Sequence, residues 1–291
     1  MINKHKSIDE EILSSLLYSI SSELSVHIPS NSFYNHLLLV ARNSILNLYG
    51  KNKKNKANLG FLGEIHLPYF SMGAIDSTHL FGLDELILFS FYHKNKNLYS
   101  RVSDLGANIG LHSIVLSNLG YKVTSYEPDP IHFEKLTQNT NLNNISNINL
   151  VNKAVSTENG QLEFIRVLGN TTGSHLAGSK NNPYGNLNKF KVDVVPFLEI
   201  CKASDLIKID VEGHEAKILL STNNNDWSNT DAIVEVGNQE NCNQIFEHFQ
   251  NIEINLFSQK KSWERVSKIE DMPNSYKEGS LFISKKEKMP W

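Results

Sequence analysis

The sequence predicts an α/β protein with a mostly parallel sheet, preceded by a helical extension. Two observations carry this prediction. From residue 98 onward, short apolar runs with strand character alternate with amphipathic runs of helical period, and this order is typical of βαβ units. The stretch up to residue 49 shows helical periodicity alone.

The amino-terminal segment contains two predicted helices. Residues 7–24 begin with an S-x-x-E capping box, and residues 33–49 end before a glycine. We assign residues 1–75 to a helical extension and residues 76–291 to the main domain. Three uses of the extension remain open: a lid over a ligand site, a homodimer contact, or simple packing on the main domain.

The main domain alternates strands with helices. The predicted strands are residues 99–105, 122–127, 148–155, 205–210 and 230–236, and the predicted helices are residues 79–92, 110–119, 130–143, 215–221 and 239–249. Residues 161–168 and 189–195 alternate like strands on either side of a polar loop. The tail adds strand-like runs at residues 252–258 and 280–284, which we expect to form an antiparallel edge.

Composition and charge exclude several classes of protein. Hydrophobic residues make up 40% of the 291 residues, and the net charge is −3. A protein that binds duplex nucleic acid needs an excess of basic residues, which this chain lacks. No apolar run approaches the ~20 residues of a membrane span. The chain start has no secretory signal, and the two cysteines, Cys201 and Cys242, form no disulfide or zinc pattern. We therefore expect a cytoplasmic protein without a nucleic-acid partner or a membrane span.

The stretch DLGANIG, between the first strand and the following helix, carries the strongest signal of a ligand site. Ligands of open α/β sheets bind at the carboxyl ends of the strands. Gly106 and Gly110 let backbone approach a ligand, and Asn108 tolerates positive φ. Asp104 can accept a hydrogen bond from a cationic amine. Leu111 replaces the third glycine of a dinucleotide fingerprint, so that signature is broken.

Carboxylates end two further strands. Glu127 lies ~20 residues after the glycine turn, where a carboxylate holds the ribose of a bound nucleoside. Asp210 ends the apolar run LIKID and precedes Glu212, His214 and Glu215. We expect a function for Asp210, because the end of a core strand is a poor place for a merely solvated acid. For His214 and Glu215, a place in the first turn of a helix explains the residues equally well.

The motifs DLGANIG, YEP, LIKIDVEGHE and IVEVG follow one another with the order and spacing of the FkbM-type family of S-adenosylmethionine-dependent methyltransferases, which the chain resembles over residues 80–285. The resemblance implies the Rossmann-like class I methyltransferase fold, with a seven-stranded, mostly parallel sheet whose last strand is antiparallel. It implies S-adenosylmethionine as the cofactor. By this resemblance the methionine part is surrounded by Asp104, Gly106, Ala107, Asn108 and Gly110, the ribose by Glu127, and the adenine by Ala154.

Members of this family commonly methylate hydroxyl groups, so the resemblance implies an O-methyltransferase acting on a sugar, a glycolipid or another small-molecule acceptor. We expect Asp210 and Glu212 to orient and deprotonate this acceptor. His214 and His175 are alternative bases.

Three other interpretations remain open. Asp210, Glu235 and Asn238 could hold Mg²⁺ beside the acceptor, although two acids at adjacent strand ends are more often hydrogen-bonded neighbours than a metal site, so we predict no metal. An NAD(P)-dependent oxidoreductase or epimerase would also use a carboxylate such as Glu127 to bind ribose. However, its dinucleotide fingerprint requires a glycine where this chain has Leu111. A non-catalytic nucleoside-binding module is the third.

Overall fold

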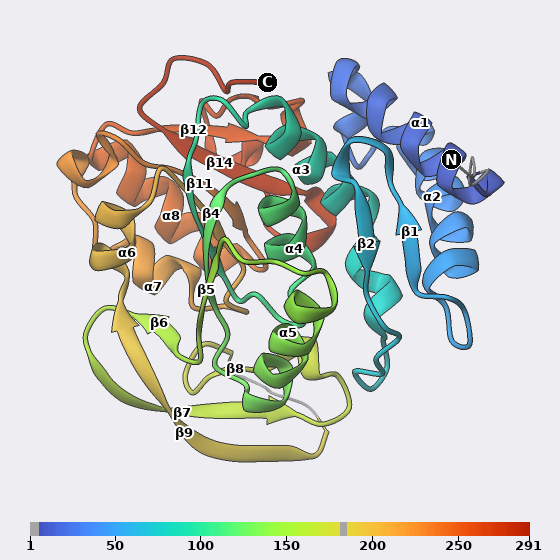
Figure 1. Cartoon of the computed structure of the whole chain (residues 1–291). Helices are drawn as coiled ribbons and strands as arrows, with labels where there is room; N and C mark the ends of the chain where they lie inside the picture. Colours follow the sequence, from blue (N-terminus) through green and yellow to red (C-terminus); the bar gives the residue numbers. More distant parts are fainter. Residues whose placement is uncertain (1–5, 181–184) are drawn as a thin grey trace.

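An eight-stranded sheet forms the centre of the computed structural model, which describes residues 6–180 and 185–291 (Figure 1). Its strand order is β13-β12-β14-β11-β10-β3-β4-β5. These strands are β3 (Arg101–Leu105), β4 (Lys122–Tyr126), β5 (Ile148–Val151), β10 (Leu206–Ile209), β11 (Asp231–Glu235), β12 (Asn255–Ser258), β13 (Glu264–Arg265) and β14 (Ser280–Ser284). The neighbours from β11 to β5 pair in parallel.

The predicted fold class is confirmed, with two differences in the sheet. The last strand, β14, is antiparallel as expected, but it inserts between β11 and β12 instead of pairing at an edge. A two-residue strand, β13, pairs with β12 and adds an eighth strand to the expected seven. Such a short strand leaves too little sequence pattern to be recognised in advance.

Helices cover both faces of the central sheet. Helices α3 (Leu83–Lys94) and α4 (Leu111–Asn118) pack on one face with α5 (Pro130–Leu142) beside α4, and α6 (Phe197–Ala203), α7 (Glu215–Leu219) and α8 (Gln239–Asn251) pack on the other (Figure 1). Successive residues of β10 alternate between the two cores, with Leu206 in one and Ile207 in the other. The carboxyl ends of the parallel strands are therefore held between two packed layers.

The predicted strand 148–155 is wrong as a single element. Strand β5 ends at Val151, and β6 (Ala154–Ser156) joins a second sheet of order β6-β9-β7-β8. Asn152 fixes the bend between them, because its side-chain amide donates a hydrogen bond of 2.7 Å to the carbonyl of Glu127. The other strands are β7 (Gly160–Val167), β8 (His175–Leu176) and β9 (Leu187–Pro196), so the two strand-like runs predicted here form an antiparallel pair.

Residues 6–75 pack on the rest of the described chain. Helix α1 (Ile8–Ser22) buries Leu13 and Leu17 in the same core as α3, and Ser90 donates a hydrogen bond of 3.2 Å to the carbonyl of Leu17. Helix α2 (Ser32–Tyr49) packs on α1, and a small sheet of β1 (Lys56–Asn58) and β2 (Glu64–His66) follows. These elements complete one face of the fold.

The predicted helix 79–92 is divided by Gly82 into η3 (Ser77–Phe81) and α3. The remaining short helices are η1 (Leu24–His27), η2 (Gly60–Leu62), η4 (Thr171–Gly173), η5 (Asn224–Trp227), η6 (Gln259–Lys261), η7 (Ile269–Asp271) and η8 (Tyr276–Glu278). Across residues 6–180 and 185–291, every helix is too short or too polar to traverse a lipid bilayer.

Candidate functional site

A cavity of about 650 Å³ lies between the carboxyl ends of the central strands and the second sheet. Its volume falls within the ~300–1,000 Å³ typical of small-molecule sites. The strand ends contribute Gly106, Glu127, Asp210 and Glu235, and the second sheet contributes Phe164, Val167, His175 and Leu176. Gly106, Glu127 and Asp210, which the sequence singles out, thus lie at one edge of the sheet around one cavity.

The glycine turn after β3 has the backbone that its sequence predicts. Asn108 has φ of 52°, and Gly106 and Gly110 have φ of 74° and 93°. A Cβ atom on Gly106 would lie 1.8 Å from the carbonyl oxygen of Asp210, so only glycine lets the ends of β3 and β10 approach this closely. Gly110 instead makes room for Leu136 of α5. Gly106 and Asn108 line the cavity.

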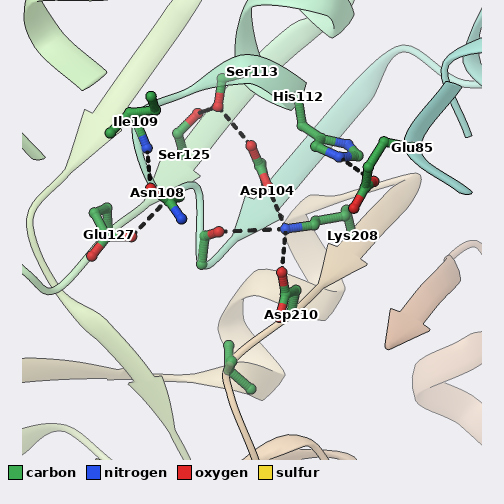
Figure 2. Close-up of polar contacts among 12 residues, drawn as sticks. Glu85, Asp104, Asn108, Ile109, His112, Ser113, Ser125, Glu127, Lys208 and Asp210 are labelled. Carbon is green, nitrogen blue, oxygen red and sulfur yellow. Dashed lines mark hydrogen bonds and ion pairs between the residues drawn. The ribbon is translucent and has the colours of Figure 1, made fainter. Parts of the chain in front are cut away.

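Glu127 ties the glycine turn to the end of β4. Its carboxylate accepts a hydrogen bond of 2.8 Å from the backbone N–H of Asn108 (Figure 2) and one of 2.7 Å from the backbone N–H of Asp129. Burial raises the pKa of Glu127 to about 8. Each carboxylate oxygen keeps a further lone pair for a hydroxyl group in the cavity.

Asp104 does not line the cavity, although the turn does. It is fully buried, accepts a hydrogen bond of 2.7 Å from Ser113, and forms an ion pair of 3.6 Å with Lys208 (Figure 2). The amine that we expected to meet Asp104 is therefore supplied by the protein itself.

Lys208 was missed in the sequence analysis. Its ammonium group lies 3.3 Å from the Asp210 carboxylate (Figure 2) and 3.4 Å from the Gly106 carbonyl oxygen. Burial opposes its charge, but the carboxylates of Asp210 and Asp104 raise the pKa of Lys208. The available signal was a lysine inside the apolar run LIKID, two residues before Asp210 and so on the same side of the strand.

Three carboxyl groups gather at the ends of β10 and β11. Asp210 and Glu235 follow paired residues of the parallel strands, and Glu212 lies two residues further on with φ of 56°. Glu212 forms an ion pair with Lys180. Burial raises the pKa of Glu212 to about 7, and Asp210 adds to the effect. Burial, Asp210 and Glu212 likewise raise the pKa of Glu235 well above its usual value.

The structure separates His214 from these acids. Its ring lies between the hydroxyl groups of Ser156 at 3.2 Å and Ser179 at 2.9 Å, and it lines a second cavity of about 540 Å³. Burial lowers the pKa of His214 to about 4. Of the three expected catalytic residues, only Asp210 and Glu212 face the first cavity.

His175, the other alternative base, does line the first cavity. Its Nδ1 donates to the carbonyl of Gly173 at 2.9 Å, which leaves Nε2 as an acceptor. Nε2 is buried and has no hydrogen-bond partner among the described residues.

The expected oxygen ligands of a metal ion are not brought together. The side-chain oxygen of Asn238 accepts a hydrogen bond of 2.8 Å from the backbone of Asn241 and caps α8, and Asn238 lines the second cavity. Elsewhere in residues 6–180 and 185–291, no three His, Cys, Asp or Glu side chains are arranged to hold a metal ion.

An apolar compartment completes the cavity at its β5 end. Ala154 of β6 packs in one apolar cluster with Phe164 and Leu176 of the same sheet, and all three line the cavity with Val155, a surface that suits a flat heteroaromatic base. Ala107 is buried and lies outside the lining. The cavity is thus lined by an apolar compartment, by the Glu127 carboxylate and by the acids after β10 and β11.

Comparison with known proteins identifies one family. Residues 104–273, more than half of the chain, match the family model described as the methyltransferase FkbM domain. No curated protein matches the chain.

Several solved structures are similar to this chain. They include precorrin-6y C5,15-methyltransferase from Geobacter metallireducens (12% identity, 67% of this chain and 84% of that chain covered, TM-score 0.37). Ribosomal protein L11 methylase from Lactobacillus delbrueckii is similar at 16% identity, with 70% and 81% covered and a TM-score of 0.37. A putative O-methyltransferase from Klebsiella pneumoniae is similar at 10% identity, with 67% and 76% covered and a TM-score of 0.35.

Proposed function

Because this chain belongs to the FkbM methyltransferase family, we propose that it transfers a methyl group from S-adenosylmethionine to a hydroxyl group of a sugar, a glycolipid or another small-molecule acceptor. One observation carries the proposal: a single cavity joins the glycine turn, the Glu127 carboxylate and the acids after β10 and β11.

The cavity residues fit the chemistry of this cofactor. Glu127 offers carboxylate oxygens to the two ribose hydroxyls, and the compartment of Ala154, Phe164 and Leu176 suits adenine. The acidic end matches the positive charges of the sulfonium and amino groups. Asp104, which lies outside the cavity, acts through Lys208 on Gly106 and Asp210 rather than on the cofactor.

In the proposed reaction the cofactor supplies an activated methyl group, and the protein aligns the acceptor hydroxyl and removes its proton. Alignment contributes up to ~7–11 kcal/mol in favourable cases, and a positioned base a further factor of ~10²–10⁴. Asp210, held by Lys208, and Glu212, held by Lys180, are oriented to hydrogen-bond the hydroxyl groups of the acceptor. Neighbouring hydroxyls of a sugar suit such a pair of carboxylates.

We also propose that the amino-terminal helices support the cavity rather than close it. No residue of α1 or α2 lines the described cavity. Arg42 of α2, however, donates a hydrogen bond of 2.8 Å to Thr78 and contacts His79, which is part of the cavity wall. A homodimer through α2 remains a second proposal, since Phe33 and Leu39 of this helix are exposed.

Calorimetric titration tests the cofactor. We expect S-adenosylhomocysteine to bind with micromolar affinity and NAD⁺ not to bind. Glu127→Ala removes the acceptor of two ribose hydrogen bonds, each worth ~0.5–1.5 kcal/mol, so it should weaken binding about 5- to 150-fold. The control Glu134→Ala, on the exposed side of α5, should leave binding unchanged. Binding of NAD⁺ instead of S-adenosylhomocysteine would favour the oxidoreductase interpretation.

Methyl transfer tests the acceptor class. The wild-type protein is incubated with methyl-labelled S-adenosylmethionine and a panel of methyl glycosides, oligosaccharides and glycolipids, with amines and thiols as comparison. We expect label in an ether linkage to a sugar oxygen. Label found on nitrogen or sulfur would keep the methyltransferase and refute the hydroxyl acceptor.

A further inference from the structure

We propose that Glu235 is the general base of this site, the group that takes the proton of the acceptor hydroxyl. The inference rests on the proposed function and goes beyond it, because that function gives no role to Glu235. From the sequence, Glu235 was considered only as a possible metal ligand. It assigns different tasks to the three carboxyl groups at the acidic end of the cavity.

The position of Glu235 places it beside the expected reaction centre. It is the last residue of β11, whose Val234 pairs with Ile209 of β10, so Glu235 and Asp210 lie next to each other at neighbouring strand ends. Glu235 is half-buried and lines the cavity.

The other candidates are already engaged. Asp210 pairs with Lys208 at 3.3 Å, and Glu212 pairs with Lys180. Such an ion pair stabilises the ionised carboxylate and occupies part of it, although burial still raises the pKa of Glu212. His214 lines a different cavity, and Nε2 of His175 is enclosed by protein.

The side chain of Glu235, by contrast, makes no hydrogen bond or ion pair with any residue that the structure describes, although its backbone pairs with Ser280 of β14. Its environment is set by burial and by the charges of Asp210, Glu212, Glu85 and, with opposite sign, Lys208. A carboxyl group whose lone pairs are free and whose proton is held more tightly than usual is better suited to accept a proton at neutral pH than a paired one.

The same environment links Glu235 to the charge of the methyl donor. In the ligand-free protein, burial and the neighbouring acids favour the protonated form of Glu235. A positive charge in the cavity favours the ionised form. Binding of the donor sulfonium should therefore expel the Glu235 proton and prepare the base before the acceptor reacts.

The resulting step is balanced. The acceptor oxygen forms a bond to the methyl carbon while the carbon–sulfur bond breaks, and the electron pair of that bond stays on sulfur as a neutral thioether. The hydroxyl proton passes to the carboxylate of Glu235 and leaves to solvent when the next donor cation binds. Since the sulfonium charge is then gone, Glu235 retains its proton more readily after the reaction.

Proton release on binding tests the inference without an acceptor. Titrations of S-adenosylmethionine and S-adenosylhomocysteine at neutral pH, in buffers of different ionisation enthalpy, give the number of protons released. The two ligands share their amino and carboxylate groups, so the difference reports the sulfonium charge. We expect greater release with S-adenosylmethionine, and Glu235→Gln should abolish the difference.

The matched control is Glu240→Gln, an exposed residue of α8, which should keep the difference. Equal proton release for both ligands in the wild type, or a difference that persists in Glu235→Gln, would overturn the proposal. Absence of any binding to the wild type would instead refute the proposed function, so the two failures are distinguishable.

Turnover with an acceptor from the panel supplies a second test. Glu235→Gln should keep cofactor affinity within about threefold, while kcat falls by ~10²–10⁴ as expected for loss of a base. Glu235→Asp should recover part of the rate. The wild-type rate should rise with pH as the base ionises, and the residual rate of Glu235→Gln should not. Unchanged kcat in Glu235→Gln would overturn the assignment and leave the methyltransferase intact.

Discussion

Gly106 and Glu212 both have positive φ, but for different reasons. At Gly106 the lack of a Cβ allows a close approach of two strand ends. Glu212 has a side chain and still adopts φ of 56°, a conformation that costs ~1–2 kcal/mol. Its ion pair with Lys180 and the close packing of Gly213 on Ser179 offset this cost. Strain held by surrounding contacts is common at functional sites.

The glycine turn leads to a sharp prediction. Gly106→Ala would place a methyl group 1.8 Å from the Asp210 carbonyl oxygen, so β3 and β10 must separate. We expect binding of S-adenosylhomocysteine to be lost and the free energy of unfolding to fall by more than the ~1–2 kcal/mol of a positive φ alone. Calorimetric titration and chemical denaturation measure both effects.

The control for this substitution is Gly120→Ala. Gly120 has φ of 96°, but its Cβ would meet nothing within 4 Å. This variant should show the conformational cost without the loss of binding. Equal behaviour of the two variants would mean that the turn does not depend on the close approach at Gly106.

At the scale of elements, long periodic segments could be predicted from the sequence, but the second sheet only in part: its strands β7 and β9 were expected, and β6 and β8 were not. The strands around the glycine turn were found because apolar strand, turn and amphipathic helix follow each other in a fixed order. The sequence predicts one strand over residues 148–155. The break within it depends on the hydrogen bond between Asn152 and the carbonyl of Glu127, a residue far from Asn152 in the sequence. The role of Lys208 was missed because it depends on contacts made in the folded chain. Its partners are Asp104 and Gly106, which are distant in sequence, and Asp210 at the end of its own strand.

Arg166 joins the second sheet to the central one and provides the prediction at this scale. Its guanidinium group pairs with Asp129, the N-cap of α5, and lies 4.8 Å from the ring centre of Phe190. Arg166→Met leaves a buried carboxylate unpaired, which costs ~3–5 kcal/mol. We expect a large fall in the free energy of unfolding and weaker cofactor binding, because Asp129 donates its N–H to Glu127.

Lys189→Met serves as the comparison within the same sheet. Lys189 pairs with Glu163 at 3.2 Å, but both side chains are about half exposed, and such pairs contribute ~0–1 kcal/mol. Denaturant titration of both variants measures the contrast. A small effect of Arg166→Met would mean that the second sheet is held by its apolar contacts alone.

For the whole molecule, the amino-terminal segment is joined to the far end of the central sheet. His27 of η1 stacks edge-on against Trp291 at 4.5 Å between ring centres, and Trp291 lies parallel to Trp263 at 5.8 Å. Gln259 adds a hydrogen bond of 3.0 Å to the carbonyl of His27. The extension is therefore held by Gln259 of η6, by Trp263 just before β13 and by Trp291, as well as by α3.

His27 makes this connection sensitive to acid. Its Nδ1 accepts a hydrogen bond of 2.9 Å from the indole N–H of Trp263, and its Nε2 donates to the Ile20 carbonyl at 2.7 Å. Protonation of Nδ1 would set two N–H groups against each other. Burial lowers the pKa of His27 from 6.5 to about 4.

The sign of the pH effect follows from this lowered pKa. Between pH 6.5 and about 4, the unfolded chain binds a proton at His27 that the native protein does not bind, so the free energy of unfolding falls as the pH falls. The loss from this residue is at most about 3 kcal/mol over that window. His27→Gln keeps one donor and one acceptor but cannot titrate, so thermal unfolding measured from pH 7.5 to 4 should depend less on pH than in the wild type.

The control is His36→Gln, since His36 is exposed, and this variant should keep the pH dependence of the wild type. An equal pH dependence in the wild type and both variants would show that protonation of His27 does not limit stability in acid.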